Sequence, residues 1–215
     1  MKKLEQTVGE EIANSITHGI GAALSIAALV LLIIAGFRYG NAADITGVMI
    51  FGISMVFLYL MSTFCHAFGH SKGTVRKVFH ILDHSAIYVL IAGTYTPFCL
   101  SLIGGVKGYV LLGIQWTLAI IGIVFRAVYY NRNNALHVGI YIAMGWMIVF
   151  FTKTVFAMLP TAGVVLLLAG GISYTIGVIF YAIRLFKFHH MIWHFFVLGG
   201  TICHFFLIFF YIIPR

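Results

Sequence analysis

The chain has 215 residues, of which 62% are apolar and only 8% are charged, and its formal net charge is +8. Because an ordinary soluble domain is about a quarter charged, so few charges exclude a water-facing surface of this size and require lipid as the main solvent. The Lys and Arg residues are spread thinly between apolar runs, which is typical of membrane topology and excludes a nucleic-acid-binding protein.

Seven apolar runs follow one another along the chain, each near the roughly 20 residues that cross a bilayer. The first is too long for a signal peptide and is preceded by acidic residues, so we interpret it as a retained helix. Pro97 lies inside the third run and should kink it. The sequence therefore predicts an all-α membrane protein, a bundle of seven transmembrane helices that forms a single domain over residues 1–215. We place the helices at 16–36, 44–66, 80–102, 107–128, 137–157, 162–184 and 190–212.

The distribution of Lys and Arg predicts how the bundle is oriented. With seven spans, the N-terminal tail and the second, fourth and sixth connections share one side of the membrane. That side carries nine of the thirteen Lys and Arg, and the other side carries the remaining four. We therefore expect the N-terminus in the cytoplasm and the C-terminus outside.

The ten histidines form the most informative pattern. On the seven-span map nine of them lie at or near the cytoplasmic ends of helices, and only His204 lies toward the far side, where we interpret it as a buried hydrogen-bonding residue. An i,i+4 spacing puts two imidazoles on one helix face, close enough to share a metal, although one such pair alone is weak evidence. Three pairs have this spacing: His66 with His70, His80 with His84, and His190 with His194. Four histidines are interpreted as interfacial: His70, His80, His84 and His189.

Asp83 begins the apolar run "SAIYVLIAGTYTP". An acid at that depth is costly, so we expect it to face the bundle interior and to have histidines or a metal as its partner. The alternative is stabilisation by a helix N-terminus. His66 ends the second predicted helix, and His190 and His194 begin the seventh, so they share one layer with Asp83. Ser62 lies one turn before His66 on the same face.

Three neutral imidazoles with an open fourth position describe a catalytic zinc site, and a nearby carboxylate would orient or deprotonate a water there. Three further polar residues, Glu11, Asn14 and His18, share a helix face at i, i+3 and i+7. They either line this site or solvate the start of the first helix, and their spacing favours neither interpretation.

Four segments of the sequence resemble the progestin and adipoQ receptor family, most closely its bacterial hemolysin III-like branch. One is "EEIANSITHGIGA" at 10–22, and the other three contain the residues discussed above. They are "STFCH" at 62–66, "LDHSAIYVLIAGTYTP" at 82–97 and "HMIWHFFVLGGTICHF" at 190–205. The resemblance covers nearly the whole chain and implies a protein of the bacterial plasma membrane. It implies zinc as the cofactor with His66, His190 and His194 as ligands, Asp83 as the acid that holds the attacking water, and Ser62 as the site serine. The eukaryotic relatives look like zinc amidohydrolases that cleave ceramide.

The first functional hypothesis is therefore an intramembrane hydrolase that acts on a lipid-like amide or ester. Its expected partners are membrane lipids. A second is a sensor or regulator of membrane state with a structural zinc. A cytolytic pore-forming hemolysin, as the branch name suggests, would need a water-soluble form for which this composition leaves no surface, and a transporter would need more intramembrane polar groups. An open metal position would favour the hydrolase, and four protein ligands would favour a structural role. The sequence carries no indication of the oligomeric state.

Overall fold

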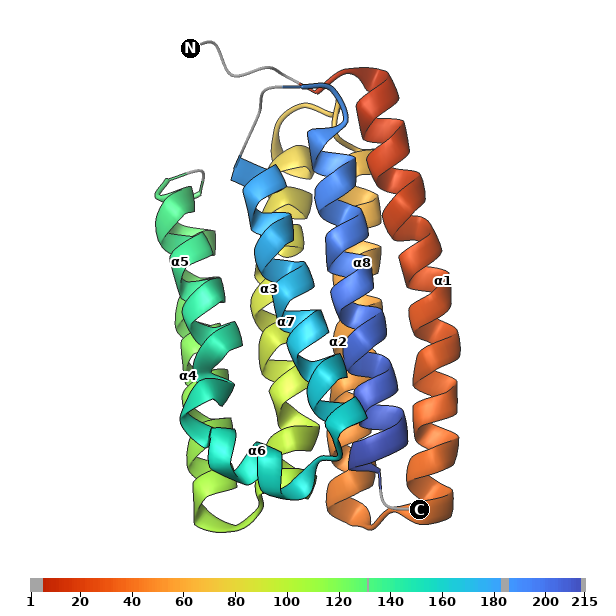
Figure 1. The fold of residues 1–215 in the computed structure, drawn as a ribbon. Helices are drawn as coiled ribbons and strands as arrows, with labels where there is room; N and C mark the ends of the chain where they lie inside the picture. Colours follow the sequence, from red (N-terminus) through yellow and green to blue (C-terminus); the bar gives the residue numbers. More distant parts are fainter. Residues whose placement is uncertain (1–5, 131, 183–185, 214–215) are drawn as a thin grey trace.

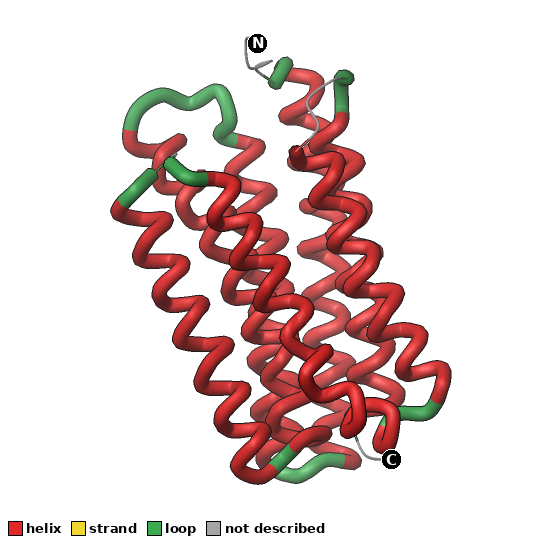
Figure 2. Tube along the Cα trace, turned by 60° about the vertical axis from the view of Figure 1, so that its left-hand side comes forward, coloured by secondary structure: helices red, strands yellow, loops and turns green. Residues whose placement is uncertain are grey.

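The computed structural model describes residues 6–130, 132–182 and 186–213, and in that part of the chain every regular element is a helix (Figures 1 and 2). Seven helical stretches are long and apolar enough to cross a membrane, as the sequence predicts. The elements are α1 (Val8–Tyr39), α2 (Ala42–Ala67), α3 (Thr74–Pro97), η1 (Phe98–Ile103), α4 (Gly105–Val128), α5 (Asn134–Gly145), η2 (Trp146–Phe151), α6 (Thr152–Met158), α7 (Thr161–Ala182), α8 (His189–Leu207) and η3 (Ile208–Ile212).

The outer surface of the bundle is covered by large apolar side chains. Phe150, Val106 and Phe37 expose 85%, 79% and 69% of their surface, which water would not tolerate over a whole bundle but lipid does. The composition and the helix lengths therefore have the same explanation, and the chain is an integral membrane protein.

Two helices begin earlier than the predicted spans at 16–36 and 80–102. α1 starts at Val8 because Thr7 and Glu10 form a reciprocal capping box, in which each side chain pairs with the other residue's backbone N–H. α3 starts at Thr74, six residues before its predicted beginning. Both added segments carry charged residues, so hydropathy marked where the apolar run begins, whereas the hydrogen-bonded helix extends further.

The third span changes its helical form at Pro97. Regular α-helix ends at this residue, and the chain continues as the π-helix η1 to Ile103. Proline has no N–H to donate and its ring crowds the preceding turn, so the normal i→i−4 ladder is interrupted here. The helical winding thus changes at the residue where the sequence predicts a kink.

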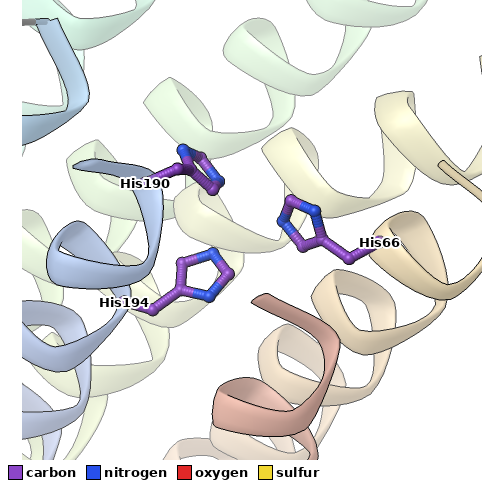
Figure 3. A group of neighbouring side chains, drawn as sticks. All are labelled: His66, His190 and His194. Atoms are coloured by element: carbon purple, nitrogen blue, oxygen red, sulfur yellow. The ribbon is translucent and has the colours of Figure 1, made fainter. Parts of the chain in front are cut away.

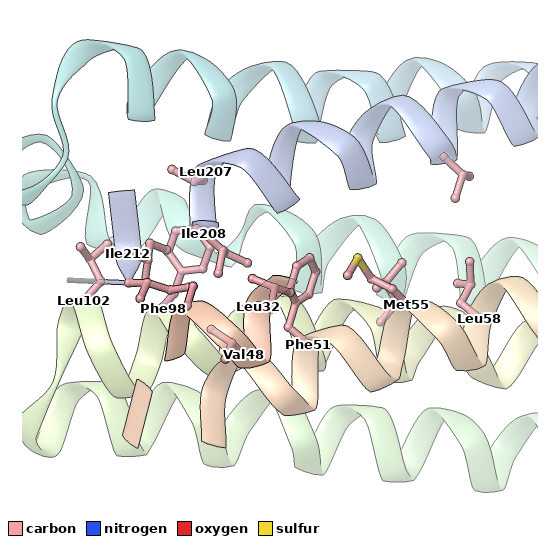
Figure 4. Packing of buried hydrophobic residues seen from close by; sticks show 14 of the residues in the cluster. Leu32, Val48, Phe51, Met55, Leu58, Phe98, Leu102, Leu207, Ile208 and Ile212 are labelled. Atoms are coloured by element: carbon pink, nitrogen blue, oxygen red, sulfur yellow. The ribbon is translucent and has the colours of Figure 1, made fainter. Parts of the chain in front are cut away.

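The order of the helices in space decides which side chains meet. α1 packs on α2 and α8, α2 packs on α3, and α7 packs on α8. Their shared core includes Leu32 of α1, Phe51 and Met55 of α2, and Leu207 of α8 (Figure 4). Because successive spans run in opposite directions, α2 ends at the same end of the bundle at which α1, α3 and α8 begin (Figure 1). We call this the histidine end.

A close helix contact at Gly108 gives a test of the packing. A Cβ on this residue would overlap the backbone carbonyl oxygen of Cys99, whereas a Cβ on Gly113 of the same helix would meet nothing within 4 Å. We expect Gly108→Ala to reduce the free energy of unfolding by on the order of 1–3 kcal/mol. The thermal midpoint of the detergent-solubilised protein should therefore fall. Gly113→Ala should leave the midpoint unchanged or raise it, because alanine favours helix. Equal midpoints for the two variants would contradict this packing.

Candidate metal centre

Three histidines converge at the histidine end. His66 lies in the last turn of α2, and His190 and His194 lie one turn apart at the start of α8. Their ring centroids are 5.0 Å apart for His66 with either partner and 4.6 Å apart for the pair on α8. One ligand atom from each lies within 4.8 Å of the other two, so the three side chains point toward a common space (Figure 3). The group is one that a single metal ion can occupy.

The hydrogen bonding of His66 leaves one ring nitrogen ready for a metal. Its Nδ1 lies 2.6 Å from Oε2 of Glu11, and because a carboxylate can only accept, Nδ1 carries the proton. The buried Nε2 then has a free lone pair, and it has no hydrogen-bond partner. An orphaned buried acceptor costs free energy, and metal ligation would satisfy it. A carboxylate behind the outer nitrogen is the usual support of a metal-ligating histidine.

His194 is held from the other side by α1. A hydrogen bond of 3.1 Å joins the Thr17 hydroxyl to Nδ1 of His194, and the same hydroxyl lies within hydrogen-bond distance of two backbone carbonyls of its own helix. In the tautomer with the proton on Nδ1, Nε2 of His194 keeps its lone pair for a metal, as in His66. The ring of His18 stacks on His194 with centroids 3.5 Å apart. The donor set is therefore neutral imidazole, which suits zinc and also copper, iron and nickel.

A small cavity of about 30 Å³ adjoins two of the three histidines, His190 and His194. Ser62 and Asp83 both line it. The Ser62 hydroxyl also lies 2.7 Å from Nδ1 of His18, whose Nε2 is buried and has no partner. The cavity is lined by His18, Leu58, Ser62, Asp83, His84, Ile87, Tyr181, His190, Trp193, His194 and Val197. The structure thus places the two candidate catalytic residues next to two of the three candidate ligands.

The surroundings of Asp83 decide between the two interpretations that the sequence leaves open. α3 begins at Thr74, so Asp83 lies well inside the helix and the helix N-terminus does not stabilise it. Nδ1 of His84, the next residue of the same helix, lies 3.5 Å from Oδ2 of Asp83, and Ser62 of α2 lines the same cavity. The acid faces the bundle interior, where it shares the cavity with the histidines of α8.

Glu11, Asn14 and His18 all lie on the inner face of α1. Glu11 contacts His66, His18 lines the cavity, and Asn14 is fully buried. Sequence reasoning missed three neighbours of this group: Glu10, Thr17 and His84. Glu10 contacts the start of α8, and Thr17 contacts His194. His84 lines the cavity, whereas its i,i+4 spacing from His80 predicts only that the two rings share a helix face. No local spacing signals these contacts, because each joins residues from different helices.

A second polar group lies at the histidine end but is separate from the three-histidine group. Arg126 of α4 is fully buried and donates to Asn134 of α5 at 2.7 Å, and it contacts the ring of His80. His137 is bonded to the Tyr88 hydroxyl at 2.7 Å. At the other end of the bundle, Nε2 of His204 donates to the Leu167 carbonyl at 3.3 Å, which confirms the expected buried hydrogen bond.

Known proteins similar to this chain come from bacteria and animals. Residues 6–205 match the family described as Haemolysin-III related. The Hemolysin-3 homolog of Bacillus subtilis (strain 168) is 51% identical over 95% of both chains, and Hemolysin-3 of Bacillus cereus is 50% identical over 100% of this chain and 97% of its own. The human monocyte to macrophage differentiation factor is 27% identical over 98% of this chain and 87% of its own.

Proposed function

This chain belongs to the Haemolysin-III related family, and from that premise we propose that it is a zinc-dependent intramembrane hydrolase of lipid-like amides or esters. The match confirms the hemolysin III-like resemblance of the sequence motifs, and with the seven apolar helices it places the chain in the bacterial plasma membrane. The reaction, the metal and the residue roles are the substance of the proposal.

The observation that carries the proposal is the three-histidine group with a cavity beside it. In the described residues three protein ligands come together, and the cavity beside them is lined by Asp83 and Ser62. Three ligands with an open position are typical of catalytic zinc sites, whereas structural sites are closed by four. This arrangement favours the hydrolase over a sensor or regulator with a structural zinc.

Each cavity residue then has a defined task in hydrolysis. A zinc ion at the three histidines would supply an activated water and polarise the scissile carbonyl. Asp83 accepts the proton of the attacking water and returns it to the amide nitrogen or ester oxygen, which leaves when its single bond to the carbonyl carbon breaks. Ser62 donates a hydrogen bond, either to Asp83 or to the oxygen on which negative charge develops.

An apolar chamber supports a lipid as the substrate. It has a volume of about 130 Å³ and runs between α3, α5, α7 and α8. Four residues line both this chamber and the small cavity: Leu58, Ile87, Trp193 and Val197. A substrate whose carbonyl lies near the histidines can therefore extend its hydrocarbon chain into the chamber.

Val197 gives a test of this path. It is 5% exposed and stands where the cavity and the chamber meet. We expect Val197→Phe to reduce turnover of long-chain N-acyl lipids much more than of short-chain ones, because the larger ring blocks the shared wall. The matched control is Val165→Phe on the lipid-facing side of α7, where 58% of the side chain is exposed. Equal losses for both chain lengths would remove the chamber from the substrate path.

The direct test of the function is hydrolysis by the purified protein. Detergent-solubilised protein would be incubated with long-chain N-acyl and O-acyl lipids, and the released fatty acid would be measured by mass spectrometry. We expect release that a strong chelator abolishes and that added zinc restores. A metal-loaded, folded protein that releases no fatty acid from either class would leave regulation of the membrane as the better hypothesis.

A further inference from the structure

The first three turns of α1 contribute no ligand to the three-histidine group, yet they contact both helices that do. Glu11 is hydrogen-bonded to His66 of α2, and Thr17 to His194 of α8. Glu10 is hydrogen-bonded to the N-cap residue that comes directly before α8. These side chains share the inner face of α1. Since α2 and α8 carry different ligands, α1 is in a position to set the distance between them.

Glu11 fits closely into its place. Only 12% of its side chain is exposed, and its carboxylate is 2.6 Å from Nδ1 of His66. The turn after α2 leaves space for it: a Cβ on Gly69 would come within 2.6 Å of the Glu11 carboxyl. The carboxylate therefore holds the imidazole in one tautomer and one orientation, with Nε2 toward the other two histidines.

Glu10 does the same for the backbone of α8. Its Oε2 accepts from the backbone N–H and the hydroxyl of Thr7, and its Oε1 accepts from the backbone N–H of Phe188 at 2.9 Å. Phe188 is the N-cap of α8 and has a φ of +62°, a conformation that a bulky residue adopts at a cost. No side chain of its own caps this helix start. Glu10 thus stabilises the turn that comes directly before His189 and His190.

We propose that α1 is the positioning helix of the metal centre, with Glu11 orienting His66 and Glu10 fixing the start of α8, so that the two adjacent carboxylates set the affinity for the metal. The proposal rests on the metal site of the proposed function but not on hydrolysis. The two glutamates are positioning residues, because neither is one of the three ligands. Their effect is on where the ligands stand before a metal arrives.

The experiment measures metal affinity in the full-length protein. Zn²⁺ alone is titrated against a competing chelator, and Co²⁺ is bound separately so that its visible absorption bands report the coordination geometry. We expect Glu11→Ala to weaken Zn²⁺ binding by about 10- to 100-fold, the usual effect of removing a partner behind a ligand. Glu11→Gln keeps the shape and one acceptor, and should lie between Glu11→Ala and wild type. Glu10→Gln leaves one acceptor for several donors and should weaken binding less than Glu11→Ala.

Ser15→Ala is the matched control. Ser15 lies on α1 between the two contact regions and donates to the Thr63 carbonyl of α2 at 3.2 Å, but it does not touch the histidines. It should leave both the affinity and the Co²⁺ spectrum unchanged. Wild-type affinity in the isosteric Glu11→Gln and in Glu11→Ala, or an equal loss in Ser15→Ala, would overturn the proposal. Absence of metal binding in the wild type would instead overturn the proposed function, so the two failures are distinguishable.

Discussion

Replacing His194 by alanine is expected to abolish stoichiometric metal binding. Wild-type protein purified in detergent should contain about one zinc per chain, and the variant should contain almost none, because two imidazoles rarely hold this ion without a third ligand. His194 is 1% exposed, and its ring is 5.0 Å from His66 and 4.6 Å from His190, so the variant leaves two of the three converging imidazoles. Metal content is measured by plasma mass spectrometry.

The control for this variant is His137→Ala. His137 is 4% exposed and lies at the same end of the bundle, but its partner is the Tyr88 hydroxyl and it is outside the three-histidine group. It should keep the metal, which separates loss of a ligand from loss of a buried histidine. A metal-free but folded wild type, or a His194→Ala variant that retains its metal, would contradict the proposed metal site.

The second large effect is expected at Asp83. Asp83→Asn preserves the shape of the side chain but removes the group that accepts a proton, so hydrolysis of lipid amides or esters should fall by about 10²- to 10⁴-fold while the metal stays bound. Initial rates of fatty-acid release and metal content are measured on the same preparations. The two readouts together separate proton transfer from metal binding.

Asp44→Asn is the matched control for this change. Asp44 is also a buried carboxylate, 3% exposed, but it pairs with the backbone N–H of Asn41 at the start of α2. A change at that position can affect stability but not the reaction, so the rate of fatty-acid release by Asp44→Asn should equal that of the wild type. Full activity of Asp83→Asn would remove Asp83 from the mechanism, and loss of metal would make it a ligand or a structural support.

The number of helices and the depth of the site were predictable from the sequence because apolar length measures position along the membrane normal. His66 at the end of one span and His190 and His194 at the start of another must lie in the same layer, whatever the lateral arrangement. The same logic placed Ser62 and Asp83 in or next to this layer. The early start of α3 at Thr74 was not predictable, because polar residues can continue a helix beyond the hydrocarbon.

Only the tertiary structure decided which side chains in that layer meet. Hydropathy carries no information on lateral order, and the contacts of α1 with both α2 and α8 arise from packing between helices far apart in the chain. The Glu11–His66 and Glu10–Phe188 hydrogen bonds join residues from different parts of the chain, and no local periodicity signals them. The sequence thus determined that polar groups collect at one depth. The packing of α1, α2, α3 and α8 determined that three imidazoles converge there and that two of them share one small cavity with a carboxylate and a serine.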